Sequence, residues 1–287
     1  MDETMLIESF VQYLIDEKNS SENTRSSYVR DIRQFSSHID GSLLSVDTLQ
    51  LESYIGIQRD KGRSSATLAR NVASLKNFYT YCVKRGYIQS SPADGLFAER
   101  SRPKPPQILS GREVDLLLDQ PRCIDLKGYR DKAMLEVLYS CGMRVSELLS
   151  LRVSDIDFDH KCIQYSVADH QRVMPLTDSA TKALQEYVLF IRKQLIRDFN
   201  EDVLFVNING EPMSRQGFWK VIKQYQKQAG IEKNITPHTL RHSFAAHQLE
   251  KGLDKRSVQK IMGHSDLTST NVYARMVDHQ KPTKNSK

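Results

Sequence analysis

The sequence predicts a mainly α-helical protein with small β-hairpins (α+β), in which a four-helix N-terminal domain precedes a larger C-terminal domain. Three observations predict this: apolar residues at helical spacing through the first hundred positions, a proline-rich stretch near residue 105, and two alternating segments with turn residues beyond it. A chain of 287 residues, 39% of them hydrophobic, is long enough for one or two domains with substantial cores. We expect domains at residues 1–102 and 109–287, joined by a linker at 103–108.

Four helical patterns fill the first domain. Each begins near a Ser, Asp or Glu that is suited to capping a helix, and two end at a glycine, where a left-handed residue is often needed. The predicted helices lie within residues 3–18, 20–39, 45–62 and 64–86.

The stretch SRPKPPQIL at residues 101–109 contains three prolines, which cannot continue a helix and favour extended backbone. After this linker, GREVDLLLDQP and YRDKAMLEVLYSCG predict two helices, and Gly142 stands where the second should end. A further helical segment, VSELLSL, follows almost at once.

Two segments of the second domain have the alternation of β-hairpins. DIDFDHKCIQYSVADHQRVMPL, residues 155–176, has a polar interruption that predicts a turn around residues 168–170. DVLFVNINGEPMS, residues 202–214, contains Asn209-Gly210, a preferred two-residue turn.

The remaining C-terminal segments predict helices with recognisable starts. Ser214 should cap RQGFWKVIKQYQKQAG, Thr236 followed by Pro237 should open the next helix, and Asp254 should open KRSVQKIMG.

The net charge of +6 is unevenly distributed. Residues 1–102 hold 13 basic and 13 acidic residues, so the whole basic excess lies after Arg102. This imbalance fits either a polyanionic partner for the second domain or an ordinary solvated surface.

Composition also limits the setting of the protein. No apolar run approaches the roughly 20 residues that a membrane span requires, and the acidic N-terminus does not resemble a signal peptide, so we expect a cytoplasmic protein without a membrane partner. The four cysteines have neither CxxC spacing nor histidine partners at metal-ligand spacing. We therefore expect neither a zinc site nor a disulfide framework.

The segment TPHTLRH, residues 236–242, concentrates nitrogen at the start of a predicted helix. His238 falls in the first turn and Arg241 three residues later, so both can face one anion beside the free N–H groups of the helix terminus. On its own this pattern also fits an ordinary surface helix.

Three further places add candidate residues. Arg144 follows the helix-ending Gly142, with Glu147 near enough to orient it. His264 follows a glycine in MGHSD, and Tyr273 comes nine residues later in STNVYARM. Each residue alone has a plain structural explanation, but their order along the chain is distinctive.

The order G-x-R-x-x-E-L, P-H-x-L-R-H, M-G-H-S and a later tyrosine resembles the tyrosine recombinase or phage integrase family, and most closely its Xer and transposon-resolution branch. The likeness spans nearly the whole chain. It implies a SAM-like, core-binding N-terminal domain and a catalytic C-terminal domain.

The resemblance also implies residue roles. Tyr273 would be the nucleophile, Arg144 and Arg241 would bind the phosphate, and Glu147 would occupy the acidic support position. His238 and His264 would flank the phosphate, and His238 is suited to take the phenolic proton because an unassisted phenol, with a pKa of about 10, is a poor nucleophile near neutrality. Because the phosphotyrosyl ester retains the bond energy, no cofactor and no metal are expected.

One family position departs from the pattern. The lysine that the family usually carries in the turn of the first hairpin, as the general acid, aligns with Val167 here. Valine cannot donate a proton. His170 is the substitute that we favour, with Arg172, a different hairpin length and alignment or a slow leaving step as alternatives, and His170 is also explicable as a solvated turn residue.

The resemblance implies a site-specific recombinase that works through a 3'-phosphotyrosyl intermediate and a Holliday junction, to resolve or integrate DNA elements. Its partners would be double-stranded DNA core sites with inverted repeats and further subunits in a homo-tetramer, or a hetero-tetramer with a paralogue. An accessory DNA-binding protein that cuts poorly and a type IB topoisomerase are the alternatives.

DNA contacts can be proposed only broadly from the sequence. Basic and amide side chains at helix positions are candidates, although a solvated helix face explains each of them equally well. They are Arg70 and Lys76 in the first domain and Arg215, Gln216 and Lys220 in the second.

Overall fold

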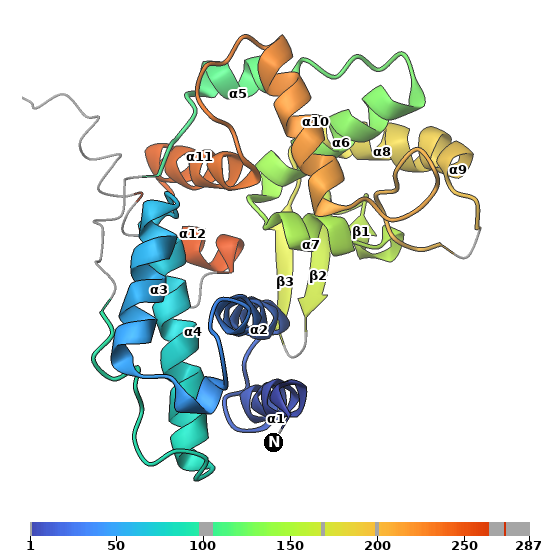
Figure 1. Cartoon of the computed structure of the whole chain (residues 1–287). Coiled ribbons are helices and arrows are strands. Elements are labelled where there is room, and N and C mark those ends of the chain that lie inside the picture. The colour runs from blue at the N-terminus through green and yellow to red at the C-terminus, as the bar shows by residue number, and fades with distance from the viewer. Residues whose placement is uncertain (1, 98–105, 168–169, 199–200, 264–272, 274–287) are drawn as a thin grey trace, which may run out of the picture. The chain divides into compact units, whose positions relative to one another are not determined.

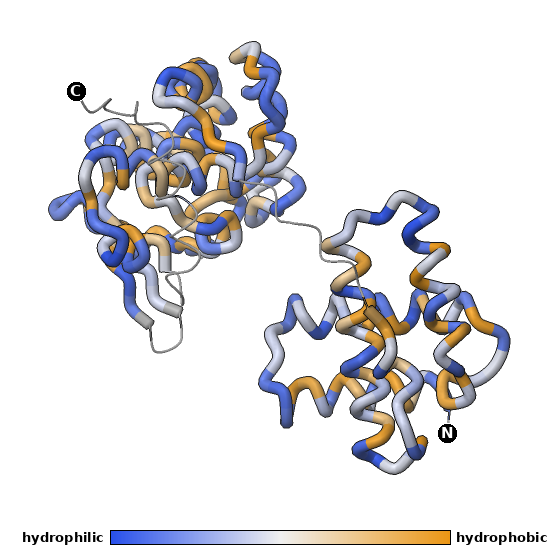
Figure 2. The backbone as a smooth tube through the Cα atoms, turned by 90° about the vertical axis from the view of Figure 1, so that its left-hand side faces the viewer, coloured by the Kyte–Doolittle hydropathy of each residue, from blue (hydrophilic) through white to orange (hydrophobic). Residues whose placement is uncertain are grey.

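The computed structural model describes residues 2–97, 106–167, 170–198, 201–263 and 273. The chain divides into two compact units, residues 1–104 and 105–287, and each unit has its own hydrophobic core. Hydrophobic positions run through the interior of each unit in Figure 2, and hydrophilic positions lie along its outside. None of the helices in these described ranges is long and apolar enough to cross a membrane.

The first unit contains four α-helices in its described part: α1 (Glu3–Asp16), α2 (Glu22–Ser36), α3 (Thr48–Asp60) and α4 (Ser65–Lys84), with a 3-10 turn at Leu43–Ser45. Hydroxyl and carboxylate caps start three of them. Ser21 accepts from the backbone of Thr24, Asp47 forms a capping box with Gln50, and Ser64 accepts from Thr67. The four-helix prediction is therefore confirmed.

A buried hydrogen bond and an ion pair join α2 to α4 inside the first unit. The buried Asp31 carboxylate accepts a 2.7 Å hydrogen bond from the Ser74 hydroxyl and pairs with Arg70 Nη1 at 2.8 Å. Burial raises the pKa of Asp31, while the Ser74 hydroxyl and the Arg70 charge oppose that rise.

The second unit contains helices and one antiparallel sheet, so the mainly helical α+β class is confirmed (Figure 1). Its described helices are α5 (Gly111–Leu118), α6 (Leu126–Cys141), α7 (Val145–Ser150), α8 (Asp178–Glu186), α9 (Arg192–Leu195), α10 (Arg215–Gln228), α11 (Pro237–Glu250) and α12 (Lys255–Met262), with a π-helical turn at Tyr187–Ile191 and a 3-10 turn at Val153–Asp155.

Helix α6 is the centre of the second unit, where it packs against α8 and α11 (Figure 1). Because α6 is buried on nearly every side, its polar residues need internal partners. Arg130 and Asp131 pair at 2.7 Å, and the Tyr225 hydroxyl donates to Asp131 from α10. This network fixes the helix that ends at the candidate site.

The sheet has the order β1-β2-β3, with β1 at Ile156–Asp157, β2 at Cys162–Val167 and β3 at His170–Pro175. The β2–β3 register pairs Tyr165 with Arg172, and Val167 with His170. The expected hairpin is present, and β3 turns Arg172 inward while Val173 is exposed.

The second hairpin that the sequence predicts is present in a short form. The amide of Gly210 donates to the Asn207 carbonyl, and a single antiparallel bridge joins Val206 to Pro212. The Asn207 amide donates to the Glu211 carbonyl and the Met213 amide to the Phe205 carbonyl, while the Leu204 amide donates to the Leu151 carbonyl, so the segment pairs with the chain on both of its sides.

Candidate active site

A glycine turn at the end of α6 places Arg144. Gly142 has a left-handed backbone, with φ of 55°, and a Cβ there would lie 2.1 Å from Cδ1 of Phe244. The Gly142 carbonyl accepts a 2.6 Å hydrogen bond from Arg241 Nη1. Glycine is thus required both by the backbone angle and by the close approach of α11.

Glu147 holds Arg144 from one turn along α7. One carboxylate oxygen accepts from the Arg144 amide at 2.7 Å, and the other accepts from Arg144 Nη1 at 3.0 Å. Arg144 Nη2 donates to the Gly263 carbonyl at 3.3 Å. The side chain of Arg144 keeps 43% of its surface exposed, so its guanidinium remains accessible to a ligand.

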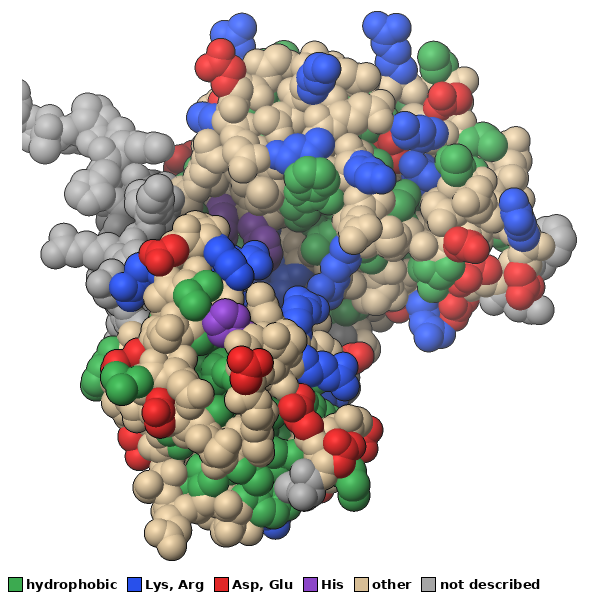
Figure 3. Space-filling model, viewed as in Figure 1, with side chains coloured by type: hydrophobic (Ala, Val, Ile, Leu, Met, Phe, Trp, Pro, Cys, Tyr) green, Lys and Arg blue, Asp and Glu red, His purple; other side chains and the backbone are tan. Residues whose placement is uncertain are grey.

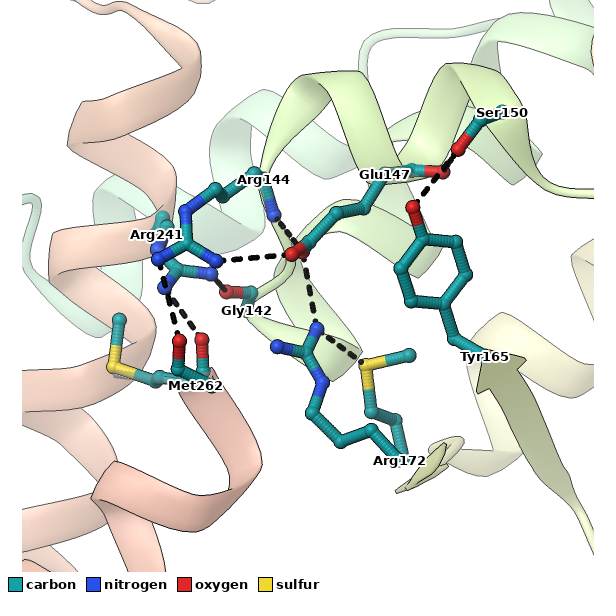
Figure 4. A network of polar contacts seen from close by, with 10 residues as sticks. Gly142, Arg144, Glu147, Ser150, Tyr165, Arg172, Arg241 and Met262 are labelled. Carbon is teal, nitrogen blue, oxygen red and sulfur yellow. Dashed lines mark hydrogen bonds and ion pairs between the residues drawn. The ribbon is translucent and has the colours of Figure 1, made fainter. Parts of the chain in front are cut away.

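A third arginine, Arg172 of β3, joins the same carboxylate (Figure 4). Its Nη2 donates to Glu147 at 3.0 Å, and its Nη1 lies so close to Gly263 that a Cβ at that position would be 1.9 Å away. The sequence had indicated Arg172 only as an alternative to the hairpin lysine. In the structure it packs between the carboxylate and the turn that ends α12.

Arg241 is buried in the first turns of α11. Thr236 caps the helix by accepting from the Thr239 amide, and Pro237 occupies the first turn. Arg241 is only 4% exposed, and besides Gly142 its guanidinium donates to the Met262 carbonyl at 2.6 Å (Figure 4). Arg241 therefore ties the ends of α6 and α12 together.

The site is strongly positive. Burial, followed by the charge of Arg144, lowers the pKa of Arg241 to about 10, so it remains protonated at neutral pH. Burial and then the charges of Arg241 and Arg144 lower the pKa of His238. Burial alone would raise the pKa of Glu147, but the amide of Arg144 and the charge of Arg172 outweigh it and hold that pKa low.

Tyr273 lies against α11 and α12. It is 4% exposed and packs in a small apolar cluster with Phe244, Val258 and Met262. Its hydroxyl is 2.7 Å from Nδ1 of His242. Burial raises the pKa of Tyr273, and the charge of Arg241 partly opposes the rise, so the group is a protonated phenol at neutral pH.

His242, the last residue of TPHTLRH, was not among the candidate residues that the sequence motifs indicated. It lies four residues, or about one helical turn, after His238, and the two rings stack with centroids 6.2 Å apart. Burial and then the charges of His238 and Arg241 lower the pKa of His242 to about 4. The i, i+4 spacing of the two histidines was the available signal.

The structure describes one candidate residue only in part and another not at all. His264 lies outside the described residues. The backbone of His170 pairs with Val167 at the turn end of the hairpin, and its side chain lies outside the described part of the structure. Among the described residues, no group of three His, Cys, Asp or Glu side chains could hold a metal ion.

The candidate DNA contacts fall into two sets. Arg70 is engaged with Asp31, and Lys76 donates to the Asp94 carbonyl at 3.2 Å, so both have partners within the first unit. By contrast, residues at the start of α10 are exposed, and Lys and Arg side chains gather over α10 in Figure 3. The exposed set is Arg215, Gln216 and Lys220.

A cluster of arginines beside a phenol is suited to phosphoryl transfer through a tyrosine. This is the class of site that the geometry defines. The residues it uses come from α7, β3, α11 and the end of α12, with Tyr273 beyond them.

Comparison with known proteins agrees with this class. The sequence model of the phage integrase family matches residues 107–280, and that of the phage integrase N-terminal SAM-like domain matches residues 7–86. The chain therefore belongs to the phage integrase family.

Named relatives are similar over almost their full length. The chain is 40% identical to the tyrosine recombinase XerD of Listeria innocua over 93% of both chains, and 36% identical to that of Staphylococcus aureus over 96% of this chain and 95% of the relative. Its fold is similar to that of the Tn1549 transposon integrase in complex with circular intermediate DNA, with a TM-score of 0.74, 22% identity and coverage of 93% and 94%. It is likewise similar to the XerH recombinase bound to palindromic difH substrate, with a TM-score of 0.74, 21% identity and coverage of 95% and 82%.

Proposed function

We propose that this chain is a site-specific tyrosine recombinase that cuts and rejoins DNA through Tyr273. The phenolic oxygen attacks a DNA phosphodiester, a Tyr–O–P bond forms, and the P–O5' bond breaks to leave a 3'-phosphotyrosyl ester and a 5'-hydroxyl. One observation carries the proposal: the Tyr273 hydroxyl is hydrogen-bonded to His242, the residue next to the buried Arg241. Relatives named tyrosine recombinase favour this enzyme over an accessory DNA-binding role.

Charge at the site supports phosphate binding. Arg144 and Arg172 both bond to Glu147, and Arg241 lies close enough for its pKa to respond to all three. These three cations and one anion leave a net charge of about two positive units. This charge attracts a phosphodiester, and it attracts the transition state more strongly because negative charge increases there. Arg144 and Arg241 are the two arginines that we assign to the non-bridging oxygens, because a fork of donors fits that geometry.

The remaining assignments rest on family resemblance. Glu147 supports Arg144 by the contacts described above, and His238 and His264 flank the phosphate. His238 is the proton acceptor in this assignment, and its lowered pKa keeps it neutral and able to accept at pH 7.

Departure of the 5'-oxygen needs a proton donor or a cation. Val167 occupies the position where the family has lysine, so we assign this step to His170, which pairs with Val167 across the hairpin end. Arg172, two positions along β3, is the alternative. Its strong base character makes it an electrostatic stabiliser of the leaving oxygen rather than a proton donor.

Double-stranded DNA is the partner that the family and the charge of the second unit favour. We infer that α10 supplies part of the contact surface through Arg215, Gln216 and Lys220, with most of the affinity coming from phosphate neutralisation. We further propose that four subunits, identical or paired with a paralogue, act on two core sites with inverted repeats and exchange strands through a Holliday junction.

The test uses a DNA site enriched from random-sequence duplexes by the purified full-length chain, then nicked close to the cleavage point so that the cut cannot be resealed. Wild-type protein should accumulate a covalent protein–DNA complex that resists denaturant, and Tyr273→Phe should bind the same DNA without forming it. Equal covalent yield from both proteins would refute Tyr273 as the nucleophile. Relaxation of supercoiled plasmid that lacks the enriched site would favour a topoisomerase.

A further inference from the structure

Helix α11 carries two histidine–tyrosine pairs with the same distance between ring nitrogen and hydroxyl oxygen. His242 Nδ1 lies 2.7 Å from the Tyr273 hydroxyl, and His247 Nδ1 lies 2.7 Å from the Tyr139 hydroxyl. Tyr139 belongs to α6, which precedes α11 in the chain, whereas Tyr273 follows α11. One pair therefore involves the proposed reacting oxygen, and the other is an internal reference for the same interaction in a structural setting.

We propose that His242 is a further catalytic residue, whose Nδ1 accepts the phenolic proton of Tyr273 when this oxygen attacks the phosphate. The proposal rests on the recombinase function proposed above, and it moves the proton-acceptor role from His238 to the histidine that contacts the nucleophile. In this step the O–H bond of Tyr273 breaks, the Tyr–O–P bond forms and the proton goes to His242. The P–O5' bond then breaks, and the departing oxygen is protonated by a separate donor.

Contact distance favours His242 over His238. A general base must lie within hydrogen-bond reach of the proton it removes, roughly 2.6–3.2 Å between heavy atoms. The 2.7 Å separation from Tyr273 meets this requirement without rearrangement. The ring of His242 neighbours those of both Tyr273 and His238, with centroid separations of 5.4 and 6.2 Å.

Before the reaction the proton lies on the phenol and the imidazole beside it is neutral. The phenol of Tyr273 is protonated because burial raises its pKa, and the imidazole of His242 is neutral because burial and nearby cations lower its pKa to about 4. A neutral imidazole with Nδ1 as acceptor carries its proton on Nε2. The pair is thus arranged with the proton on the nucleophile and a vacant acceptor beside it.

A bound phosphate would make His242 a stronger base at the moment it is needed. Burial lowers the pKa of His242 most, followed by the charges of His238 and Arg241, and the phosphate is proposed to bind Arg241. A negative charge placed beside Arg241 offsets the effect of this cation on the imidazole and favours the protonated form of His242. The basicity of His242 is therefore coupled to occupation of the site by DNA.

The test measures the single-turnover rate of covalent complex formation on the nicked substrate. His242→Asn retains a side-chain oxygen that can accept a hydrogen bond near the position of Nδ1 but cannot hold a proton. We expect His242→Asn and His242→Ala each to slow the reaction roughly 100-fold or more, the scale of general-base catalysis. DNA affinity should stay within about threefold of wild type, because neither variant removes an arginine.

His247→Asn is the matched control, because it removes the same kind of tyrosine contact from the same helix away from the reacting oxygen. We expect its rate to stay within about threefold of wild type once the folded fraction is measured. A His242→Asn rate within threefold of wild type would overturn the assignment, and so would an equal loss in the His247→Asn control. If wild type forms the covalent complex and Tyr273→Phe does not, either result removes the His242 role and leaves the recombinase function intact.

Discussion

Replacing Gly142 by alanine should damage both the stability and the chemistry of the second unit. The residue is left-handed with φ of 55°, and an added Cβ would lie 2.1, 2.6 and 2.8 Å from three carbons of the Phe244 ring. Placing an L-residue in this conformation costs roughly 1–2 kcal/mol. Forcing a methyl group against a buried ring costs a further 1–3 kcal/mol, approximately the usual range for overpacking. We therefore expect Gly142→Ala to lower the free energy of unfolding by about 2–5 kcal/mol.

Gly230→Ala provides the control that separates the two costs. Gly230 is also left-handed, with φ of 65°, but an added Cβ would meet nothing within 4 Å. It should show the backbone cost alone, about 1–2 kcal/mol. Urea unfolding can be followed by the fluorescence of Trp219, the single tryptophan of the chain, which lies in the second unit and reports on that unit separately.

Gly142→Ala should also slow covalent complex formation, because Gly142 sets the start of α7 for Arg144 and its carbonyl accepts from Arg241. Gly230→Ala should cleave at close to the wild-type rate. If the two variants lose equal stability, the close approach of Phe244 does not matter energetically. If Gly142→Ala then also cleaves normally, the turn does not position the arginines.

Three other outcomes follow from the site and the DNA surface. Because the pKa of Glu147 lies below its ordinary value of 4.5, its charged form stabilises the fold at neutral pH, and this contribution is lost as the pH falls through the lowered value. Glu147→Gln should therefore lower the free energy of unfolding in urea by roughly 2–3 kcal/mol at pH 7 and by much less at about pH 3. An equal loss at both pH values would contradict the charge-based explanation. A substrate with sulfur in place of the bridging 5'-oxygen has a leaving group that needs no proton, so it should rescue cleavage by His170→Ala if His170 is the general acid; a rate that stays low on this substrate would exclude that role. Lys220→Ala should reduce the slope of log affinity against log salt by about 1 in a binding titration, whereas Lys76→Ala, whose lysine already has a partner in the first unit, should change it little.

Local signals predicted much of the fold. The four N-terminal helices, the stop at Gly142, the caps at Ser214, Thr236 and Asp254, and the first hairpin were all expected and are present. These features depend on side chains within a few residues of each other, which compete for the same backbone groups. The second hairpin was also expected and is present in a short form, but the sequence did not indicate that Leu204 beside it takes its backbone partner from Leu151, some fifty positions earlier in the chain.

The sequence indicated the candidate site through the order and spacing of its residues: Arg144 with Glu147, His238 with Arg241, and Tyr273. Such motifs indicate the chemistry because forked cations and a phenol have few other uses together. Spacing along one helix also placed His238 near Arg241, since residues three apart share a face.

Only the tertiary structure decided which groups touch. Arg172 reaches Glu147 from a strand 25 residues away, Arg241 closes on the ends of α6 and α12, and His242 rather than His238 meets the Tyr273 hydroxyl in the contacts described. These contacts depend on how separate elements pack, and packing is set by the combined shapes of side chains distant in sequence, such as Phe244 against Gly142. A pattern along the chain specifies the residue types and the local backbone, whereas the distances between their reactive atoms exist only after the core has formed.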